Sequence, residues 1–154
     1  MMQLVAVVLL MLVLPAASVI HDVASSGAGV MEAIGKWFVY WGVGWRLAVA
    51  GLHQTLRPGF TVRDIFGVSD PRAARLVLEI GFGNLAIGAL GVASLHAPQW
   101  TPAAALAGAI FYVLAGLQHV RNKPAARPEI VAMVSDLGLA VVLAAYLGWL
   151  ALAA

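Results

Sequence analysis

The sequence contains no cysteine and few charged residues. Without cysteine among its 154 residues, the chain can form no disulfide, no thiolate metal site and no cysteine nucleophile. Charged residues make up 10% of the chain and hydrophobic residues 62%, whereas ordinary soluble domains contain about 25% charged residues. A soluble fold of this length could not bury so much apolar surface, so the composition predicts a membrane protein.

Motifs that name a reaction are also missing. There is no nucleophile–base pair of the serine-hydrolase kind and no His-Glu-x-x-His, and Gly81-Phe82-Gly83 lies inside an apolar run without the Lys-Ser/Thr of a phosphate loop. The basic residues are few and clustered, which is typical of a charged membrane face rather than a nucleic-acid interface. The sequence leaves enzymatic activity undecided, favours a non-enzymatic role and predicts no nucleic-acid partner.

Five apolar runs are present, each close to the roughly 20 residues that a transmembrane helix needs. They cover residues 2–20, 37–56, 72–96, 102–120 and 129–153. Asp70-Pro71 and Thr101-Pro102 are typical helix starts, with a capping residue followed by proline. We therefore expect an all-α fold, an integral membrane bundle of five transmembrane helices that forms a single domain over residues 1–154.

The distribution of charge predicts the orientation. Seven of the nine Lys and Arg residues lie in or beside two connections, and these are Arg57, Arg63, Arg72, Arg75, Arg121, Lys123 and Arg127. Five helices place both connections on one side, which the positive-inside rule makes cytoplasmic. In the cell inner (cytoplasmic) membrane, the amino terminus is then cytoplasmic and the carboxyl terminus external. All five tryptophans fall in the outer half or at its interface, and these are Trp37, Trp41, Trp45, Trp100 and Trp149.

Polar residues in the apolar runs predict a buried cluster in the inner half of the bundle. At ~1.5 Å per residue, Glu79 and Asp136 lie about 10 Å from the cytoplasmic helix ends, Tyr112 about 12 Å and Arg46 about 15 Å. A charge at membrane depth usually pairs or faces a cavity. We expect Arg46 to pair with one or both carboxylates, with Asn84 and Tyr112 extending the cluster. Such pairing can serve helix association alone, or it can line a site that binds or conducts a ligand.

The four histidines permit a different interpretation. His21 and His96 fall at the outer ends of two helices, and His53 and His119 near the inner ends of two others. Two levels of paired histidines are the arrangement of a transmembrane di-haem cytochrome, with His53 and His119 as candidate haem or metal ligands. Histidine is also common at helix ends near the interface.

A tryptophan stripe offers a third kind of site. Trp37, Trp41 and Trp45 recur every four residues, so they share one face of an α-helix. Such a stripe can stack on a flat lipophilic ligand such as a quinone or sterol. An aromatic belt that runs down from the membrane interface produces the same stripe, and this is the interpretation that we prefer.

The chain resembles a family of small bacterial multi-pass membrane proteins that is known only as a domain of unknown function. The stretches that carry the likeness are Gly35-Lys36-Trp37-Phe38, Gly44-Trp45-Arg46, Gly51-Leu52-His53-Gln54, Phe60-Thr61, Ile65-Phe66-Gly67, Leu78 to Leu90 with Glu79 and Gly81-Phe82-Gly83-Asn84-Leu85-Ala86, and Val131 to Asp136. More distantly, Arg46, Gly51 and Pro58 are similar to the first helix of DoxX-like proteins, small four-helix membrane proteins of which some are associated with quinone-linked redox systems. The additional first helix departs from that pattern, and the resemblance implies no catalytic residue.

Three functional hypotheses follow. The first is a non-enzymatic membrane module that binds a lipid-like or small ligand, or a partner helix, at the polar cluster. The second is a small proton-coupled transporter or channel that uses Glu79 or Asp136, and the third is a redox accessory subunit with haem or quinone as its cofactor. Membrane lipid is the expected surrounding partner, and the short loops and small helix faces permit a homo-oligomer or a partner membrane protein.

Overall fold

The computed structural model describes residues 2–65, 67–68, 70, 72–123 and 127–153, and within these ranges the chain is helical with short connections and no strand. The elements are α1 (Met2–Val8), η1 (Leu9–Val13), α2 (Leu14–Ser26), α3 (Val30–Trp37), η2 (Phe38–Trp45), α4 (Arg46–Leu56), α5 (Pro58–Phe60), η3 (Thr61–Ile65), α6 (Ala73–Ala93), η4 (Pro98–Trp100), α7 (Thr101–Arg121) and α8 (Arg127–Ala153). The predicted all-α fold is confirmed for these residues.

Four helical stretches are long and apolar enough to cross a membrane. They are Val5–Ser26, Ala73–Ala93, Pro98–Arg121 and Glu129–Ala153. The remaining predicted span lies in a continuous helical run, Val30–Leu56, made of α3, η2 and α4. This run is not among the four, because Lys36, Arg46 and the polar residues near its end lower its hydropathy. That it crosses the membrane therefore stays a prediction.

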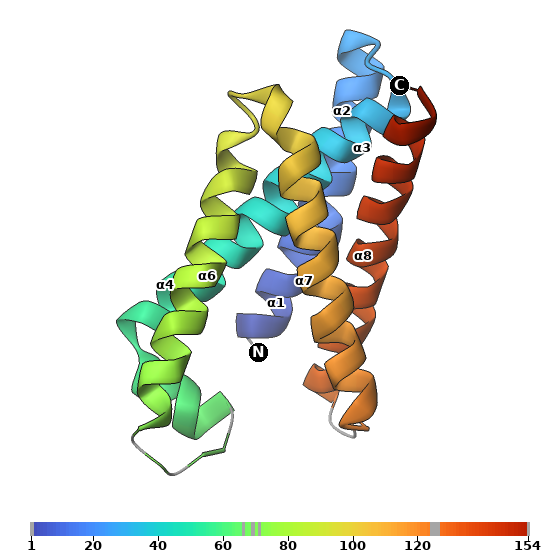
Figure 1. Cartoon of the computed structure of the whole chain (residues 1–154). Coiled ribbons are helices and arrows are strands. Elements are labelled where there is room, and N and C mark those ends of the chain that lie inside the picture. Colours follow the sequence, from blue (N-terminus) through green and yellow to red (C-terminus); the bar gives the residue numbers. More distant parts are fainter. Residues whose placement is uncertain (1, 66, 69, 71, 124–126, 154) are drawn as a thin grey trace.

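The Val30–Leu56 run slants across the molecule (Figure 1), from the pair formed by α7 and α8 to α6, against which its last part, α4, packs. In Figure 1, α4 packs on α6 at one side and α7 packs on α8 at the other. The run begins beside α8 and α2 at one end of the molecule and finishes beside α6 at the opposite end. It thereby connects the two pairs, and it brings Arg46 into the middle of the bundle.

Both basic connections lie at one end of the molecule. The connection from α4 to α6 and the connection from α7 to α8 are at the bottom of Figure 1, whereas the turn at residues 27–29, the connection from α6 to α7 and the carboxyl end of α8 are at the top. This arrangement is the one that the charge pattern requires if all the helical runs cross.

Several boundaries differ from the sequence prediction, and the helical run predicted from residue 37 already begins at Val30. The first helix continues past residue 20 to Ser26, and the hydroxyls of Ser25 and Ser26 donate to the carbonyls of His21 and Asp22 one turn earlier. It ends at Gly27, whose φ of 68° is left-handed. The third predicted span ends at Ala93 rather than residue 96. At its start, Asp70 Oδ1 accepts a hydrogen bond of 2.8 Å from the Arg72 amide, whereas Pro71 lies outside the described residues.

Glycines bring the backbones of α6 and the slanting run close together. A Cβ atom on Gly88 would lie 2.5 Å from the Ala48 nitrogen, and one on Gly91 would lie 2.6 Å from the Gly44 nitrogen. Small residues are the usual means by which membrane helices approach closely. The position of Arg46, between Gly44 and Ala48, is therefore fixed by backbone packing.

The core is centred on the slanting run. Val39, Val43 and Leu47 are almost fully buried, and they pack with Tyr112 of α7 and Leu143 of α8. A polar side chain that reaches this core is surrounded by apolar side chains. Whether a predicted site residue can meet solvent or a ligand therefore depends on how exposed it is.

Candidate functional site

Asp136, His119, Tyr112 and Arg46 form a group that we call the inner polar cluster. Asp136 on α8 is 7% exposed, and its Oδ2 lies 3.9 Å from His119 Nε2 on α7, an ion pair when the histidine carries a proton. The Arg46 guanidinium on α4 interacts electrostatically with both Asp136 and Tyr112. Three helices thus supply one cationic, one anionic and two neutral or titratable groups to one place.

Tyr112 is tied to a distortion in the slanting run. Its hydroxyl donates a 2.5 Å hydrogen bond to the Gly42 carbonyl. That carbonyl belongs to η2, a π-helical segment in which the Arg46 amide bonds the carbonyls of Trp41 and Val43 and not that of Gly42. Tyr112 therefore takes the acceptor that an α-helix would use for Arg46. Single-turn π-bulges often occur at functional sites, and η2 is a longer segment of eight residues.

One hydrogen-bond donor of the Arg46 guanidinium has no acceptor among the described residues. Its Nε is buried and has no hydrogen-bond partner, and no ion pair within 4.0 Å joins Arg46 to a carboxylate of the described residues. A buried donor without an acceptor costs about 1–3 kcal/mol, more when it is charged. The cluster therefore contains a buried donor whose hydrogen bond is not made within the described residues.

Asn84 belongs to a separate polar contact. It is buried on α6, and its Nδ2 donates to Gln54 Oε1 on α4 at 2.8 Å. Gln54 was not among the predicted site residues, although a second amide side chain within an apolar run could have identified it. The pair links α4 to α6 further toward the basic end of the molecule than Arg46.

Within the described residues, no contact joins Glu79 to the inner polar cluster. It is exposed and lines a shallow hollow of about 380 Å³ together with Arg75 and Phe82. Glu79 precedes Asn84 by five residues, which is a rotation of about 140° around an α-helix. Because Asn84 and the glycines face α4, Glu79 points away from them.

His53 and His119 have different neighbours. The ring of His53 packs edge-on against Phe60 with centroids 5.3 Å apart, whereas His119 faces Asp136. Within the part of the chain that the structure describes, no three His, Cys, Asp or Glu side chains come together as a set of metal ligands. The haem and metal interpretation of these histidines stays a prediction.

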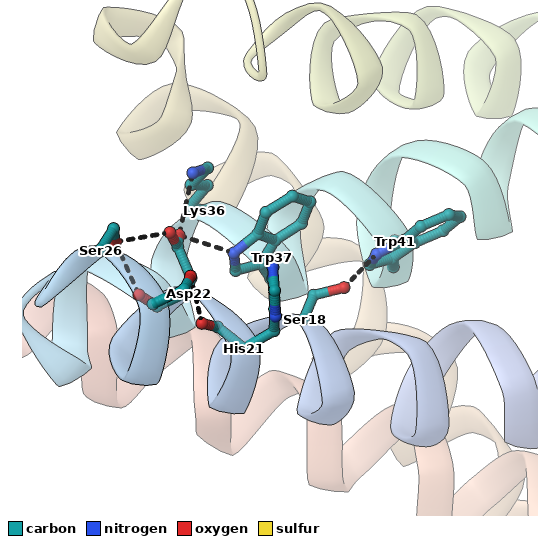
Figure 2. Close-up of polar contacts among 8 residues, drawn as sticks. Ser18, His21, Asp22, Ser26, Lys36, Trp37 and Trp41 are labelled. Atoms are coloured by element: carbon teal, nitrogen blue, oxygen red, sulfur yellow. Dashed lines mark hydrogen bonds and ion pairs between the residues drawn. The ribbon is translucent and has the colours of Figure 1, made fainter.

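A second polar network lies at the opposite end of the bundle (Figure 2). Asp22 accepts hydrogen bonds from Lys36 Nζ at 2.9 Å, Trp37 Nε1 at 2.8 Å and Ser26 Oγ at 2.9 Å. Trp41 Nε1 donates to Ser18 Oγ at 3.1 Å. Two of the three tryptophans of the predicted stripe therefore hold α2 against the slanting run, and Trp45 is the exposed member.

No protein-family model, curated protein or solved structure matches this chain. The resemblance to a small bacterial membrane family and to DoxX-like proteins therefore stays a prediction. Any function has to be argued from the side chains and their surroundings.

Proposed function

We propose that this chain is a non-enzymatic integral membrane protein that binds a small, lipid-like ligand at the inner polar cluster. The ligand places an acceptor oxygen against Arg46 Nε and its apolar part among the surrounding aliphatic side chains. The observation that carries the proposal is the buried Nε without a partner, in a guanidinium that interacts through space with the buried Asp136 carboxylate.

The surroundings favour a ligand that is mostly apolar. Val43, three residues before Arg46, and Leu47, which follows it, are almost fully buried. A strongly charged ligand would lose its hydration on entering, and an anion would also be repelled by Asp136. A carbonyl or hydroxyl oxygen carries no net charge, so neither cost applies to it. A quinone, a sterol or the ester group of a lipid has this chemistry.

The proposal includes the predicted topology. In it, five helices cross the cytoplasmic membrane, the slanting run is one of them, and the basic end of the molecule faces the cytoplasm. The cluster then lies in the inner half of the membrane, where a ligand enters between helices from the bilayer. A second copy or a partner membrane protein would contact the exposed helix faces.

Native mass spectrometry after purification in a mild detergent tests the proposal. We expect the wild-type protein to retain a ligand mass that organic extraction releases, and Arg46→Gln to lose it. Arg63→Gln is the matched control, because Arg63 is exposed near the basic end and its loss should leave the ligand in place. Equal retention by Arg46→Gln and Arg63→Gln, or no bound mass in the wild type, would contradict the proposal.

A small proton-coupled transporter is the second candidate, and one contact favours it. The side chain of His119 is 34% exposed and lies 3.9 Å from that of Asp136, which is 10% exposed. This contact gives a route by which a proton can pass between an accessible imidazole and a buried carboxylate.

Flux in proteoliposomes separates this candidate from ligand binding. A transporter predicts a proton-driven flux that Asp136→Asn abolishes and Glu79→Gln preserves, because Glu79 lies on the exposed face. Both substitutions remove one carboxylate without changing side-chain size, so they form a matched pair. Loss of flux in both variants, or in neither, would contradict the route through Asp136.

The absorption spectrum of the same purified sample tests the third hypothesis, a redox accessory subunit. A Soret band would support haem at the histidines and contradict ligand binding as the principal role. An extracted quinone would instead identify the lipid-like ligand of the first proposal.

A further inference from the structure

An apolar groove lies between the first helix and α8, away from the inner polar cluster. It has a volume of about 480 Å³, and its lining residues are Val7, Val8, Met11, Leu12, Phe38, Ile130, Val131, Val134, Ser135, Gly138, Leu139 and Val142. Among the lining residues that the structure describes, Ser135 is the one with a polar side chain, and its hydroxyl donates to the Ala132 carbonyl at 2.9 Å. This described part of the lining therefore offers aliphatic contact and no free side-chain donor.

The groove is separate from the inner polar cluster. Val134 and Gly138 each lie two residues from Asp136, which is a rotation of about 200° around an α-helix. Asp136 faces His119 on α7, whereas Val134 and Gly138 face the first helix. A ligand in the groove would not contact Asp136, so occupation of the groove and the proposed function can fail independently.

A basic residue stands at one end of the groove. Arg127 is exposed at the start of α8 and precedes Val131 by four residues and Val134 by seven, so it lies on the same face of the helix. This end of α8 belongs to the basic end of the molecule (Figure 1). The lining of α8 from Ile130 to Val142 extends about 18 Å along the helix axis, close to the ~15 Å of half a hydrocarbon core.

We propose that the groove binds one acyl chain of an anionic membrane phospholipid whose phosphate lies against Arg127. The apolar lining matches the chain, its length matches one leaflet, and the charge at its end matches the headgroup. The phosphate accepts from the Arg127 guanidinium, a pairing that arginine's planar set of donors suits.

The lining favours a flexible chain over a partner helix. Helices associate in membranes through small residues spaced four apart, which let the backbones approach. Here the small residues of α8 in the groove are Ser135 and Gly138, three apart, among branched aliphatic side chains. An acyl chain can follow such an uneven surface, and van der Waals contact with the concave wall distinguishes it from the bulk lipid.

Lipid retention in nanodiscs of equal phosphatidylglycerol and phosphatidylcholine tests the proposal. After the protein is transferred to mild detergent, native mass spectrometry should show retained phosphatidylglycerol in excess over phosphatidylcholine. Val134→Trp should fill the groove and lower retention at least fivefold. Val141→Trp is the matched control, because Val141 lies on the same helix outside the groove and the two valines are similarly exposed, 69% and 61%. Equal retention by the two variants would overturn the proposal.

The headgroup is tested by a second pair of variants. Arg127→Gln should reduce the preference for phosphatidylglycerol about fivefold, since one basic residue near the membrane surface contributes about that factor. Arg121→Gln removes an exposed arginine at the end of α7 and should leave the preference unchanged. An unchanged preference in Arg127→Gln would overturn the assignment of the phosphate. A dimer that Val134→Trp dissociates would show instead that a second copy of the chain occupies the groove.

Discussion

Arg46 combines a buried donor without a partner and a carboxylate within electrostatic range. A charged side chain at the centre of a membrane helix costs about 2.5–3.5 kcal/mol on insertion scales, and the cost is offset only where the charge finds a counter-charge or an acceptor. Asp136 supplies the counter-charge through space, although no contact within 4.0 Å joins the two residues. The stability of the bundle should therefore depend on both residues together.

A double-mutant cycle of Arg46→Gln and Asp136→Asn measures this dependence. We expect each single substitution to destabilise the protein, because each leaves the other charge buried without compensation. The double variant should be more stable than the sum of the single effects predicts, with a coupling of about 0.5–3 kcal/mol, measured by unfolding in mixed micelles with increasing dodecyl sulfate. Arg46→Gln with Glu79→Gln is the control cycle and should show no coupling. The absence of coupling with Asp136 would rule out the electrostatic link.

At the residue scale, the sequence predicts how far each polar residue lies along its helix but not the direction in which its side chain points. Arg46, Tyr112 and Asp136 were predicted from helix rise alone, and the structure brings their side chains into one cluster. Glu79 was predicted at the same depth as Asp136, but it lies on the exposed face of α6, because a predicted depth says nothing about rotation around the helix. The partners that complete the contacts, His119 for Asp136 and Gln54 for Asn84, require the positions of two helices at once.

The η2 segment is the element that sequence reasoning could not foresee. Spacing by four residues assumed an α-helix through Trp37, Trp41 and Trp45, but Phe38–Trp45 is π-helical, and each turn holds more residues. The tryptophans consequently differ in role, since Trp37 and Trp41 donate hydrogen bonds to the first helix and Trp45 is exposed. The long apolar helices were predicted well, because hydropathy and length alone define them.

Close packing of α6 on the slanting run can be tested with two glycines of the same helix. A Cβ at Gly88 would lie 2.5 Å from the Ala48 backbone, whereas a Cβ at Gly83 meets no atom within 4 Å. We expect Gly88→Val to separate the helices and destabilise the protein by about 2 kcal/mol or more, as overpacking of a close contact does. Gly83→Val should be nearly neutral. Thermal unfolding in detergent, followed by circular dichroism, compares the two variants, and equal melting temperatures would contradict the packing.

At the scale of the whole molecule, the charge pattern of the sequence agrees with the ends at which the connections lie. The two basic connections lie at one end, and the turn at residues 27–29 and the connection from α6 to α7 lie at the other (Figure 1). The sequence predicted this grouping because successive connections lie on opposite sides when every run crosses, so the second and the fourth connection share a side. It could not show that the slanting run crosses, since Arg46, His53 and Gln54 make that run less apolar than the four long helices.

Whether Val30–Leu56 crosses decides the topology, because the crossing puts Arg46 inside the membrane and the turn at residues 27–29 on the side opposite both basic connections. The chain has no cysteine, so single cysteines can be introduced at exposed positions and labelled in intact cells with a membrane-impermeant maleimide. Ser25→Cys and Gln99→Cys should be labelled from outside, and Arg63→Cys and Asn122→Cys only after permeabilisation. Labelling of Arg63→Cys from the same side as Ser25→Cys would show that the run does not cross, and it would contradict the topology with five crossings.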